Sequence, residues 1–506
     1  MEISRYEIIL PLCDKNRETI KGKGLLVNGL YGAFDVVSRE TAEALKKGDL
    51  EAVPGEERER LLRRGHLTED REREKEDLKM LARVERQISR SGAGLVLLPT
   101  YDCNFRCPYC FEKHRLSSGD EWLKKTMSRE MVDAIFQGAG KLIQRGVRIE
   151  NVTLYGGEPL LKKNIGLIRY ITEKAAGISK NLSVITNGYE LDSYIELLKE
   201  FSFKHIQITL DGEREVNDRR RVHKDGIGSY DRILRNVELA VQNGLPVALR
   251  INTGPENIDT AASLKKVFEE KGLIGSEHFS YYFKATFGEY YPGKDYGIND
   301  VQIFEMLLDR GYSFEEAVKL ENAYGGIGGE LAELFKKEEY MRPVASYCGA
   351  ESGMYVIDPE GTIFSCWDFV AMKDMAVGKV DVETGKYLFG LPLAQWRTRT
   401  VQLMPKCSEC PYCFACRGGC AGKAYFEKGD YMTELCGESK KIFDDIASVA
   451  AGVRYEETKE TELTKSLKEA VSALDEGQRS ILITSKSQRE IYETAKPFLQ
   501  KAGSED

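Results

Sequence analysis

The chain of 506 residues has little histidine, no long apolar run and no excess of positive charge. Without a stretch of about 18 apolar residues, a membrane span is not expected. The start "MEISRYEIIL" lacks the basic residues and the small-residue cleavage site of a secretion signal, so we expect a cytoplasmic protein. A net charge of −8 offers no general attraction to a phosphate backbone, and we therefore expect no nucleic-acid partner.

The twelve cysteines are unevenly distributed. Three lie in "TYDCNFRCPYCFEK", at Cys103, Cys107 and Cys110, and eight lie from Cys348 to Cys436, with no histidine inside either group. In a chain without a secretion signal, clustered thiols indicate metal ligation rather than disulfides. The two groups therefore predict sites for a soft metal.

Residues 1–90 predict a small module followed by a linking helix. Asn28-Gly29 lies within apolar runs and indicates a hairpin with a tight turn. Ser38 can cap the helix that follows, and the charged segment before residue 90 carries a helical stripe that includes Leu78 and Leu81. Short strands with helices of this kind are typical of a winged-helix-like module.

From Gly94 onward, strand and helix patterns alternate. Six such units predict a parallel sheet, open or curled into a barrel, with ligand sites at the carboxyl ends of its strands. The expected strands are "LVLLPT", "RIENVTLY", "LSVIT", "HIQITL", "PVALRIN" and "HFSYYFKA". The cysteine trio follows the first strand, "GGEP" the second, "TNG" the third and "LDG" the fourth. These motifs therefore predict one shared site.

The expected fold class is α/β, a partial (β/α)6 TIM-type barrel between an N-terminal winged-helix-like module and a C-terminal Cys-rich domain. The expected division is 1–90 for the recognition module and linking helix, 91–300 for the barrel, 301–345 for a connecting insertion, 346–450 for the Cys-rich domain and 451–506 for a polar helical tail.

The cysteine trio is one ligand short of a closed zinc site. A four-iron four-sulfur cluster held by three cysteines instead keeps one iron open. The segment, including Tyr109, resembles the signature of the radical S-adenosylmethionine (SAM) superfamily. The resemblance implies that the open iron binds the amino and carboxylate groups of SAM, and that one electron cleaves SAM to methionine and a 5′-deoxyadenosyl radical. A zinc site completed by a distant residue is the alternative.

The resemblance also assigns SAM contacts to the later strand ends. "GGEP" resembles the motif that holds the SAM amino group, although the same letters can form an ordinary turn. Thr186, Asn187 and Thr209, with Asp211 nearby, resemble residues that contact the ribose and the methionine carboxylate, and Arg250 could pair with that carboxylate or stay within the barrel. The implied SAM contacts are Tyr109, Gly156, Gly157, Glu158, Pro159, Thr186, Asn187, Thr209 and Arg250.

The second cysteine group resembles the SPASM domain, a C-terminal extension of radical SAM enzymes that modify peptides. This resemblance implies two auxiliary [4Fe-4S] clusters, hence three clusters in all. One set of ligands would be Cys407, Cys410, Cys416 and Cys436, and the other Cys348, Cys366 and Cys420, with Cys413 as a candidate fourth ligand or with one iron open to a substrate thiolate. Zinc knuckles, and a ferredoxin-like run from Cys407 to Cys416, are the alternatives.

Asp368 lies two residues after Cys366. In sulfatase-maturing members of the family an aspartate close to the corresponding cysteine acts as a base. Trp367 shifts the offset here by one residue, so an exposed or capping aspartate is the alternative. Asp368 is nevertheless our candidate catalytic residue.

These resemblances together imply an oxidoreductase that matures a ribosomally made precursor peptide and is similar to the thioether-forming maturases of sactipeptides and ranthipeptides. The N-terminal module would bind the leader by adding a strand, or would be a structural cap. A donor such as flavodoxin or ferredoxin would supply electrons. The alternatives are carbon–carbon crosslinking, epimerisation, formylglycine formation of the sulfatase type, and a noncatalytic metal-binding adaptor.

Overall fold

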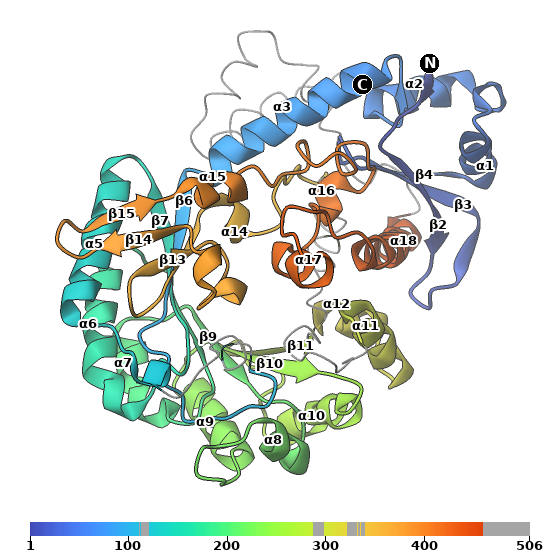
Figure 1. Cartoon of the computed structure of the whole chain (residues 1–506). Helices are drawn as coiled ribbons and strands as arrows, with labels where there is room; N and C mark the ends of the chain where they lie inside the picture. Colours follow the sequence, from blue (N-terminus) through green and yellow to red (C-terminus); the bar gives the residue numbers. More distant parts are fainter. Residues whose placement is uncertain are drawn as a thin grey trace.

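The computed structural model describes residues 1–110, 112, 121–286, 298–320, 331, 334 and 340–458. Part of the expected insertion, including its "YGGIGGE" stretch, and the tail beyond residue 458 lie outside these residues. Within them, no helix is both long and apolar enough to cross a membrane. A ten-stranded sheet and a separate three-stranded sheet organise the chain (Figure 1).

The three-stranded antiparallel sheet, in the order β2-β3-β4, forms the N-terminal module. One face packs on the helices that follow it, through residues such as Leu26, Val37 and Leu45. Ser38 caps α1 by accepting a hydrogen bond from the Thr41 backbone nitrogen, which confirms the predicted cap. The elements are β1 (Glu2–Ile3), β2 (Glu7–Cys13), β3 (Thr19–Asn28), β4 (Phe34–Ser38), α1 (Arg39–Lys47), α2 (Gly55–Arg64), β5 (Leu67–Thr68) and α3 (Arg71–Ser89).

The β3–β4 hairpin is present, but its turn differs from the predicted tight turn at Asn28-Gly29. The side-chain oxygen of buried Asn28 accepts hydrogen bonds from the backbone nitrogens of Leu30 and Tyr31, at 3.1 and 2.8 Å. The positive φ falls on Gly32, at 71°. Because an asparagine side chain can replace a backbone acceptor, it closes a longer loop at residues 29–33.

A buried ionic network joins the module's strands to the segment after α2. Asp35 is fully buried, pairs with Arg64, accepts a hydrogen bond from Arg60 at 2.8 Å and lies 2.7 Å from His66 Nε2. The other ring nitrogen of His66 lies 2.9 Å from the carboxylate of Glu7. Burial lowers the pKa of His66, but Glu7 and Asp35 together raise it to about 9.

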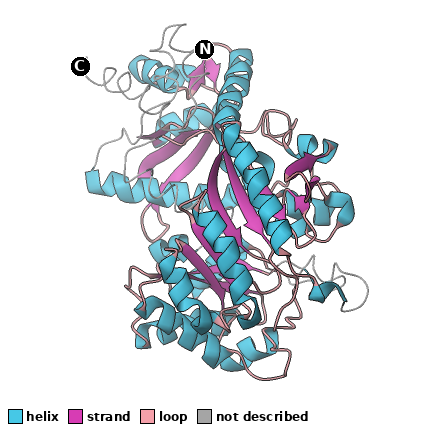
Figure 2. Cartoon of the chain, turned by 90° about the vertical axis from the view of Figure 1, so that its left-hand side faces the viewer, coloured by secondary structure: helices cyan, strands magenta, loops and turns pink. Residues whose placement is uncertain are grey.

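All six predicted barrel strands are present and parallel. They are β6 (Gly92–Leu97), β7 (Arg148–Leu154), β8 (Leu182–Thr186), β9 (His205–Thr209), β10 (Val247–Thr253) and β11 (Phe279–Ala285). Helices cover the outer side of the curled sheet (Figure 2). They are α5 (Arg129–Gln144), α6 (Ile165–Ala176), α7 (Ile195–Glu200), α8 (Arg214–Arg220), α9 (Tyr230–Gln242), α10 (Ile258–Glu270), α11 (Asp300–Asp309) and α12 (Phe314–Leu320).

The Cys-rich region continues the barrel sheet instead of forming a sheet of its own. β12 pairs in parallel with β6, and three antiparallel strands extend the sheet beyond it. The elements are α14 (Gly349–Ser352), β12 (Met354–Ile357), β13 (Thr362–Phe364), β14 (Gly378–Asp381), β15 (Lys386–Phe389), α15 (Leu391–Trp396), α16 (Cys413–Cys416), α17 (Ala421–Lys428) and α18 (Glu438–Thr458).

Helix α18 crosses the expected boundary between residues 450 and 451. It lies against the N-terminal sheet, between that sheet and the Cys-rich region (Figure 1). A Cβ on Gly452 would lie 1.8 Å from the carbonyl oxygen of Cys13. Gly452, which falls within the segment expected as a polar tail, thus allows α18 to approach β2 closely.

We predict that Asp35→Ala destabilises the module by about 3 kcal/mol, because Arg64 and His66 stay buried without their shared acceptor. Hydrogen exchange of the backbone amides in β2, β3 and β4 measures the effect. The control Glu59→Ala, at an exposed position of α2, should change stability by less than about 0.5 kcal/mol. Equal protection in the two variants would contradict the prediction.

Candidate active site

The cysteine trio lies in the loop after β6, and contacts within the chain hold this loop. The backbone nitrogen of Arg106 donates to the Val222 carbonyl at 2.7 Å, and its side chain donates to the Cys103 carbonyl at 2.6 Å. Burial, and then the nearby Glu158 and Cys107, raise the pKa of the Cys103 thiol. Because metals bind the thiolate, a bound cation would offset this penalty.

Glu158, after β7, connects the trio loop with the end of β8. Its buried carboxylate accepts hydrogen bonds from the Leu160 nitrogen at 2.8 Å and from the Thr186 hydroxyl and Asn187 nitrogen, both at 2.6 Å. Burial raises the pKa of Glu158 to about 7. The Asn187 side chain donates to Asn104 at 2.7 Å. The structure therefore brings these three strand ends together.

The glycines of "GGEP" are required by the trio loop itself. Gly156 has a φ of 112°, and a Cβ on Gly157 would lie 2.4 Å from the carbonyl oxygens of Tyr101 and Asp102. The Glu158 nitrogen donates to Asp102 at 2.8 Å. The two glycines thus let one loop approach another closely, and their contact with SAM stays a prediction. Buried Pro159 continues this turn.

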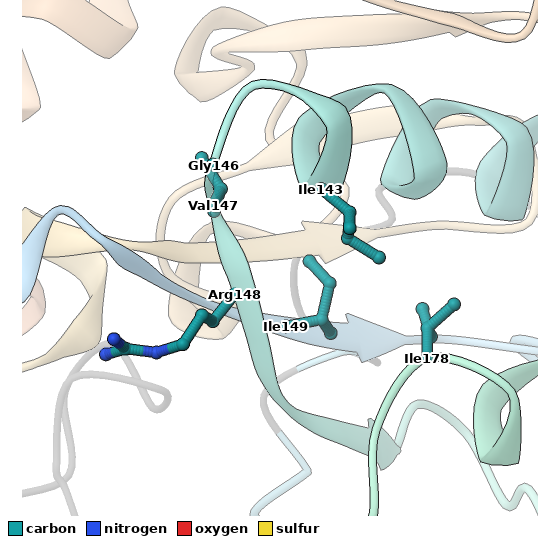
Figure 3. A pocket seen from close by; sticks show the side chains of 6 residues that line it. All are labelled: Ile143, Gly146, Val147, Arg148, Ile149 and Ile178. Carbon is teal, nitrogen blue, oxygen red and sulfur yellow. The ribbon is translucent and has the colours of Figure 1, made fainter.

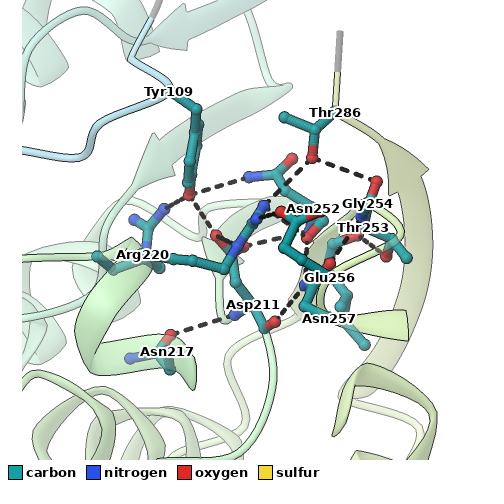
Figure 4. A network of polar contacts seen from close by, with 12 residues as sticks. Tyr109, Asp211, Asn217, Arg220, Asn252, Thr253, Gly254, Glu256, Asn257 and Thr286 are labelled. Carbon is teal, nitrogen blue, oxygen red and sulfur yellow. Dashed lines mark hydrogen bonds and ion pairs between the residues drawn. The ribbon is translucent and has the colours of Figure 1, made fainter. Parts of the chain in front are cut away.

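A second network connects the trio loop to the ends of β9 and β10 (Figure 4). The Tyr109 hydroxyl donates to buried Asp211 and accepts from Arg221 at 2.7 Å. Arg220 lies over the Tyr109 ring, 5.0 Å from its centroid, and pairs with Asp211 at 3.3 Å. The backbone nitrogen of Asn252 also donates to Asp211. Sequence reasoning missed both arginines because they belong to the charged run "DRRR", which suggests a solvated surface.

The inner face of the barrel sheet is polar. Thr209 and Arg250 are register partners, so they share a face. Arg250 donates to Asn252 at 2.8 Å, and the Tyr282 hydroxyl donates to Gln207 at 2.7 Å. A closed TIM barrel fills this space with apolar layers. Here the face instead presents hydrogen-bonding groups suited to a polar molecule.

Cys348, Cys366 and Cys420 form one thiol group in the Cys-rich region. Burial, and then Asp368, Cys420 and Cys348, raise the pKa of the Cys366 thiol. Asp368 lies in the 3₁₀ turn Trp367–Phe369, and the Trp367 ring is 6.0 Å from that of Tyr155, after β7. Asp368 therefore lies by the Cys366 thiol, in a turn whose Trp367 contacts a residue at the end of β7.

Cys407, Cys410, Cys416 and Cys436 form the other thiol group. Burial, and then Cys416, Cys436 and Cys410, raise the pKa of Cys407 to about 12. Cys413 lies by Cys410 and Cys407, and its sulfur is 3.9 Å from the Gly29 carbonyl oxygen in the N-terminal module. Its position gives no support to a role as fourth ligand of the Cys348 group.

Each thiol group supplies three or four cysteines, which matches the number of ligands that a four-iron cluster takes. Among the described residues, no three Cys, His, Asp or Glu side chains converge to hold one metal ion. A four-iron cluster accepts its thiolates at separate irons, so they need not converge on one point.

Sequence reasoning also missed Arg399. It is fully buried, pairs with Glu351 and donates to the carbonyls of Gly419 at 2.8 Å and Gly418 at 3.0 Å. Those carbonyls directly precede Cys420, and Glu351 follows Cys348 by three residues. Arg399 therefore holds the segments that carry these two thiols, and no local sequence signal distinguishes it from other arginines.

A pocket of about 330 Å³ opens at the amino-terminal end of β7 (Figure 3). It is lined by Ile143, Gly146, Val147, Arg148, Ile149 and Ile178. The motifs described above all follow the carboxyl ends of their strands. This pocket therefore lies at the opposite end of the barrel from the candidate site.

Comparison with known proteins agrees with this arrangement. Residues 97–267 match the model of the Radical SAM superfamily. The chain is 26% identical to mycofactocin maturase MftC of Mycobacterium tuberculosis over 65% of this chain and 78% of that protein. It is 24% identical to the serine-type anaerobic sulfatase-maturating enzyme of Klebsiella aerogenes over 68% and 82%.

The fold is similar to the solved structure of native anSMEcpe with bound AdoMet and Cp18Cys peptide, with a TM-score of 0.51 and 16% identity over 82% of this chain and 99% of that chain. The partial barrel and its cysteine trio agree with the family match, so residues 97–267 resemble the radical SAM superfamily and the chain is related to radical SAM enzymes. More particularly, it is related to the SPASM-type maturases, with a Cys-rich region after the barrel.

We predict that Glu158→Gln weakens SAM binding by about 5- to 100-fold. Both oxygens of the Glu158 carboxylate accept hydrogen bonds, so the NH2 group of a glutamine would face another donor at either position and the network would be disrupted. Equilibrium binding of SAM to the anaerobically reconstituted chain measures this. Glu173→Gln, exposed on α6, is the matched control and should bind SAM as the wild type does. Unchanged affinity in Glu158→Gln would contradict a role for this strand-end network in holding SAM.

Proposed function

We propose that the chain is a peptide maturase that uses SAM and three [4Fe-4S] clusters to oxidise a ribosomally made precursor peptide. The observation that carries this proposal is the grouping of ten cysteines into a trio at the barrel site and two separate groups in the Cys-rich region. The similarity to proteins named as maturases supports the same class of function.

Cys103, Cys107 and Cys110 would hold the SAM-binding cluster. Glu158, Thr186 and Asn187 would orient SAM beside it, with the remaining contacts at Tyr109, Gly156, Gly157, Pro159, Thr209 and Arg250. When bound, SAM and its cluster would supply a radical able to remove a hydrogen atom from the peptide, and an auxiliary cluster would be available to accept the remaining electron. The polar inner face of the barrel, with Gln207 and Tyr282, would bind the peptide segment to be modified.

The proposed product is a thioether between a substrate cysteine sulfur and a carbon of another residue. Support comes from the Cys348 group, which has three thiols and Asp368 beside them on the side of the barrel. Asp368 would accept the proton of the substrate thiol. The peptide loses one hydrogen atom from carbon, one proton from sulfur and one electron, so the balance is a loss of two hydrogens.

The precursor's leader would bind the N-terminal module. Its three-stranded sheet and three helices have the winged-helix-like layout, and an edge strand of such a sheet can add a strand of peptide. An electron donor such as flavodoxin or ferredoxin would reduce the clusters. A short cysteine-containing peptide encoded beside this chain is the expected substrate.

The reconstituted wild-type chain should bind about 12 irons and form 5′-deoxyadenosine with a strong reductant. Replacing Cys103, Cys107 and Cys110 by alanine should remove about four irons and all SAM cleavage. Replacing Cys348, Cys366 and Cys420 should remove about four irons but leave SAM cleavage. Iron analysis and chromatography measure these outcomes. About four irons in the wild type would contradict the auxiliary clusters, and absence of 5′-deoxyadenosine would overturn the function.

Asp368→Asn should keep the iron content and SAM cleavage but lower formation of the crosslinked peptide by about 100-fold, because the proton acceptor is lost. Mass spectrometry of the coexpressed peptide follows the loss of two hydrogens. Asp374→Asn, an exposed aspartate nearby, is the control with unchanged product. Product formation that survives in Asp368→Asn would exclude Asp368 as the base, and an unchanged peptide mass with the wild type would favour epimerisation.

A further inference from the structure

The N-terminal module and the Cys407 loop share a hydrophobic core. Tyr6, Leu30 and Tyr31 from the module lie in this core, where they meet α3 and the cysteine loop. We call this set of side chains the shared core; its members are Tyr6, Leu30, Tyr31, Leu78, Leu81, Ala82, Ala345, Val401, Met404, Cys407, Cys413 and Phe414. All are buried, so separating the module from the loop would expose them to water.

Polar contacts fix the same junction. The Tyr6 hydroxyl donates to the Ser408 carbonyl at 2.6 Å, and the Cys413 sulfur faces the Gly29 carbonyl. At Gly29 the backbones meet so closely that a Cβ would lie 1.6 Å from the Pro411 carbonyl oxygen. The loop is therefore held along most of its length by the module.

The contact points on the module belong to one rigid unit. The Gly29 nitrogen donates to the Tyr6 carbonyl at 2.9 Å, and Asn28 holds the rest of the turn through its side chain. The Asn28 amide in turn donates to the Gly65 carbonyl at 2.7 Å. A displacement of the cysteine loop would thus be transmitted to the turn and to the segment after α2.

A second path connects the module to the same thiol group through α18. This helix lies against β2, and its Asp444 accepts a hydrogen bond from Tyr412 at 2.8 Å. The Cys416 thiol lies by Ser439, also on α18. The other thiol group, by contrast, lies against Asp368, Glu351 and Arg399 on the side of the main sheet.

We propose that the N-terminal module packs directly against the centre formed by Cys407, Cys410, Cys416 and Cys436 and encloses it on one side. A cluster bound at this centre would order the module, and the module in turn would set the spectrum and reduction potential of the cluster. Cys413 and Tyr6 are positioning residues in this arrangement, and Cys413 is not a ligand. If the cluster binds only when the cysteine loop is fixed, cluster binding is coupled to the folding of the module that fixes this loop. Such coupling is reciprocal, so each event favours the other. The inference rests on the proposed function, because it requires a cluster at this group.

Hydrogen exchange of the full-length chain, reconstituted anaerobically with iron and sulfide, tests the first direction. Replacing Cys407 and Cys410 by serine should raise exchange in residues 5–31 by about tenfold or more. Replacing Cys366 and Cys420 by serine removes ligands of the other centre and should leave exchange in those residues within about twofold of the wild type. An equal response to both pairs of substitutions, or none to the first, would overturn the proposal.

The second direction is tested on the centre itself. Tyr6→Phe keeps the ring in the shared core but removes the bond to Ser408, so it should shift the paramagnetic resonance spectrum and reduction potential of one cluster. Tyr31→Phe is the matched control, because that hydroxyl donates to Asp77 on α3 at 2.7 Å; it should leave both unchanged. Identical spectra and potentials for Tyr6→Phe and wild type would overturn the proposal even where the serine variants fail to fold.

Cys413→Ala separates a positioning residue from a ligand. It should retain the wild-type iron content while shifting the same spectrum as Tyr6→Phe; loss of about four irons would show that Cys413 is a ligand. Normal iron content and 5′-deoxyadenosine formation with no change in exchange or spectra would refute the coupling alone. A chain that binds no iron would refute the proposed function together with it.

Discussion

The buried carboxylate of Glu158 is the interaction on which the barrel site depends. It accepts hydrogen bonds from two backbone nitrogens and one hydroxyl at the ends of β7 and β8. The neighbouring backbone passes so close to the cysteine loop that only glycine fits at residue 157. Because parallel strands bring their carboxyl ends to one edge, a single buried acceptor can position three loops. The trio is thereby held by the strand ends as well as by its own sequence.

A buried arginine–carboxylate pair performs a similar task in each part of the chain. Asp35 and Arg64 join β4 to α2, Asp211 and Arg220 join the segment after β9 to α8, and Arg399 and Glu351 hold the segments that carry two of the thiols. Burying such a pair costs desolvation and rarely adds stability over apolar packing. What the three pairs share is the direction of their hydrogen bonds. Each arginine has several donors in a fixed geometry, so it can hold irregular loops in one position, which apolar contacts do not specify.

The sequence predicted local structure well because local structure has short-range causes. The six strands follow from runs of apolar residues, the cap at Ser38 from one hydroxyl, and the position of the trio from the end of a strand. The pairing of β12 with β6 and the bond from Tyr6 to Ser408, 402 residues apart, have no such signal. The close approach of Gly157 and Gly452 to backbones distant in the sequence has no such signal either, because periodicity does not reveal it.

Burial of the thiols makes the Cys-rich region dependent on what it binds. Burial raises the pKa of Cys348, Cys366, Cys416 and Cys420, which favours the protonated thiols. Protonated thiols form only weak hydrogen bonds, so they contribute little to holding the region together. The segment from residue 398 to 437 consists of two short helices joined by turns that are closed by local backbone hydrogen bonds. Arg399 and the shared core fix these turns relative to the rest of the chain, and ligation of the thiolates would add to their order. If each group holds a four-iron cluster, as proposed, the four thiols next to the module would satisfy one cluster entirely, whereas the three thiols near the barrel would leave one iron for another ligand. The proposed difference in ligand number would then coincide with a difference in surroundings, as separate roles for the two groups require.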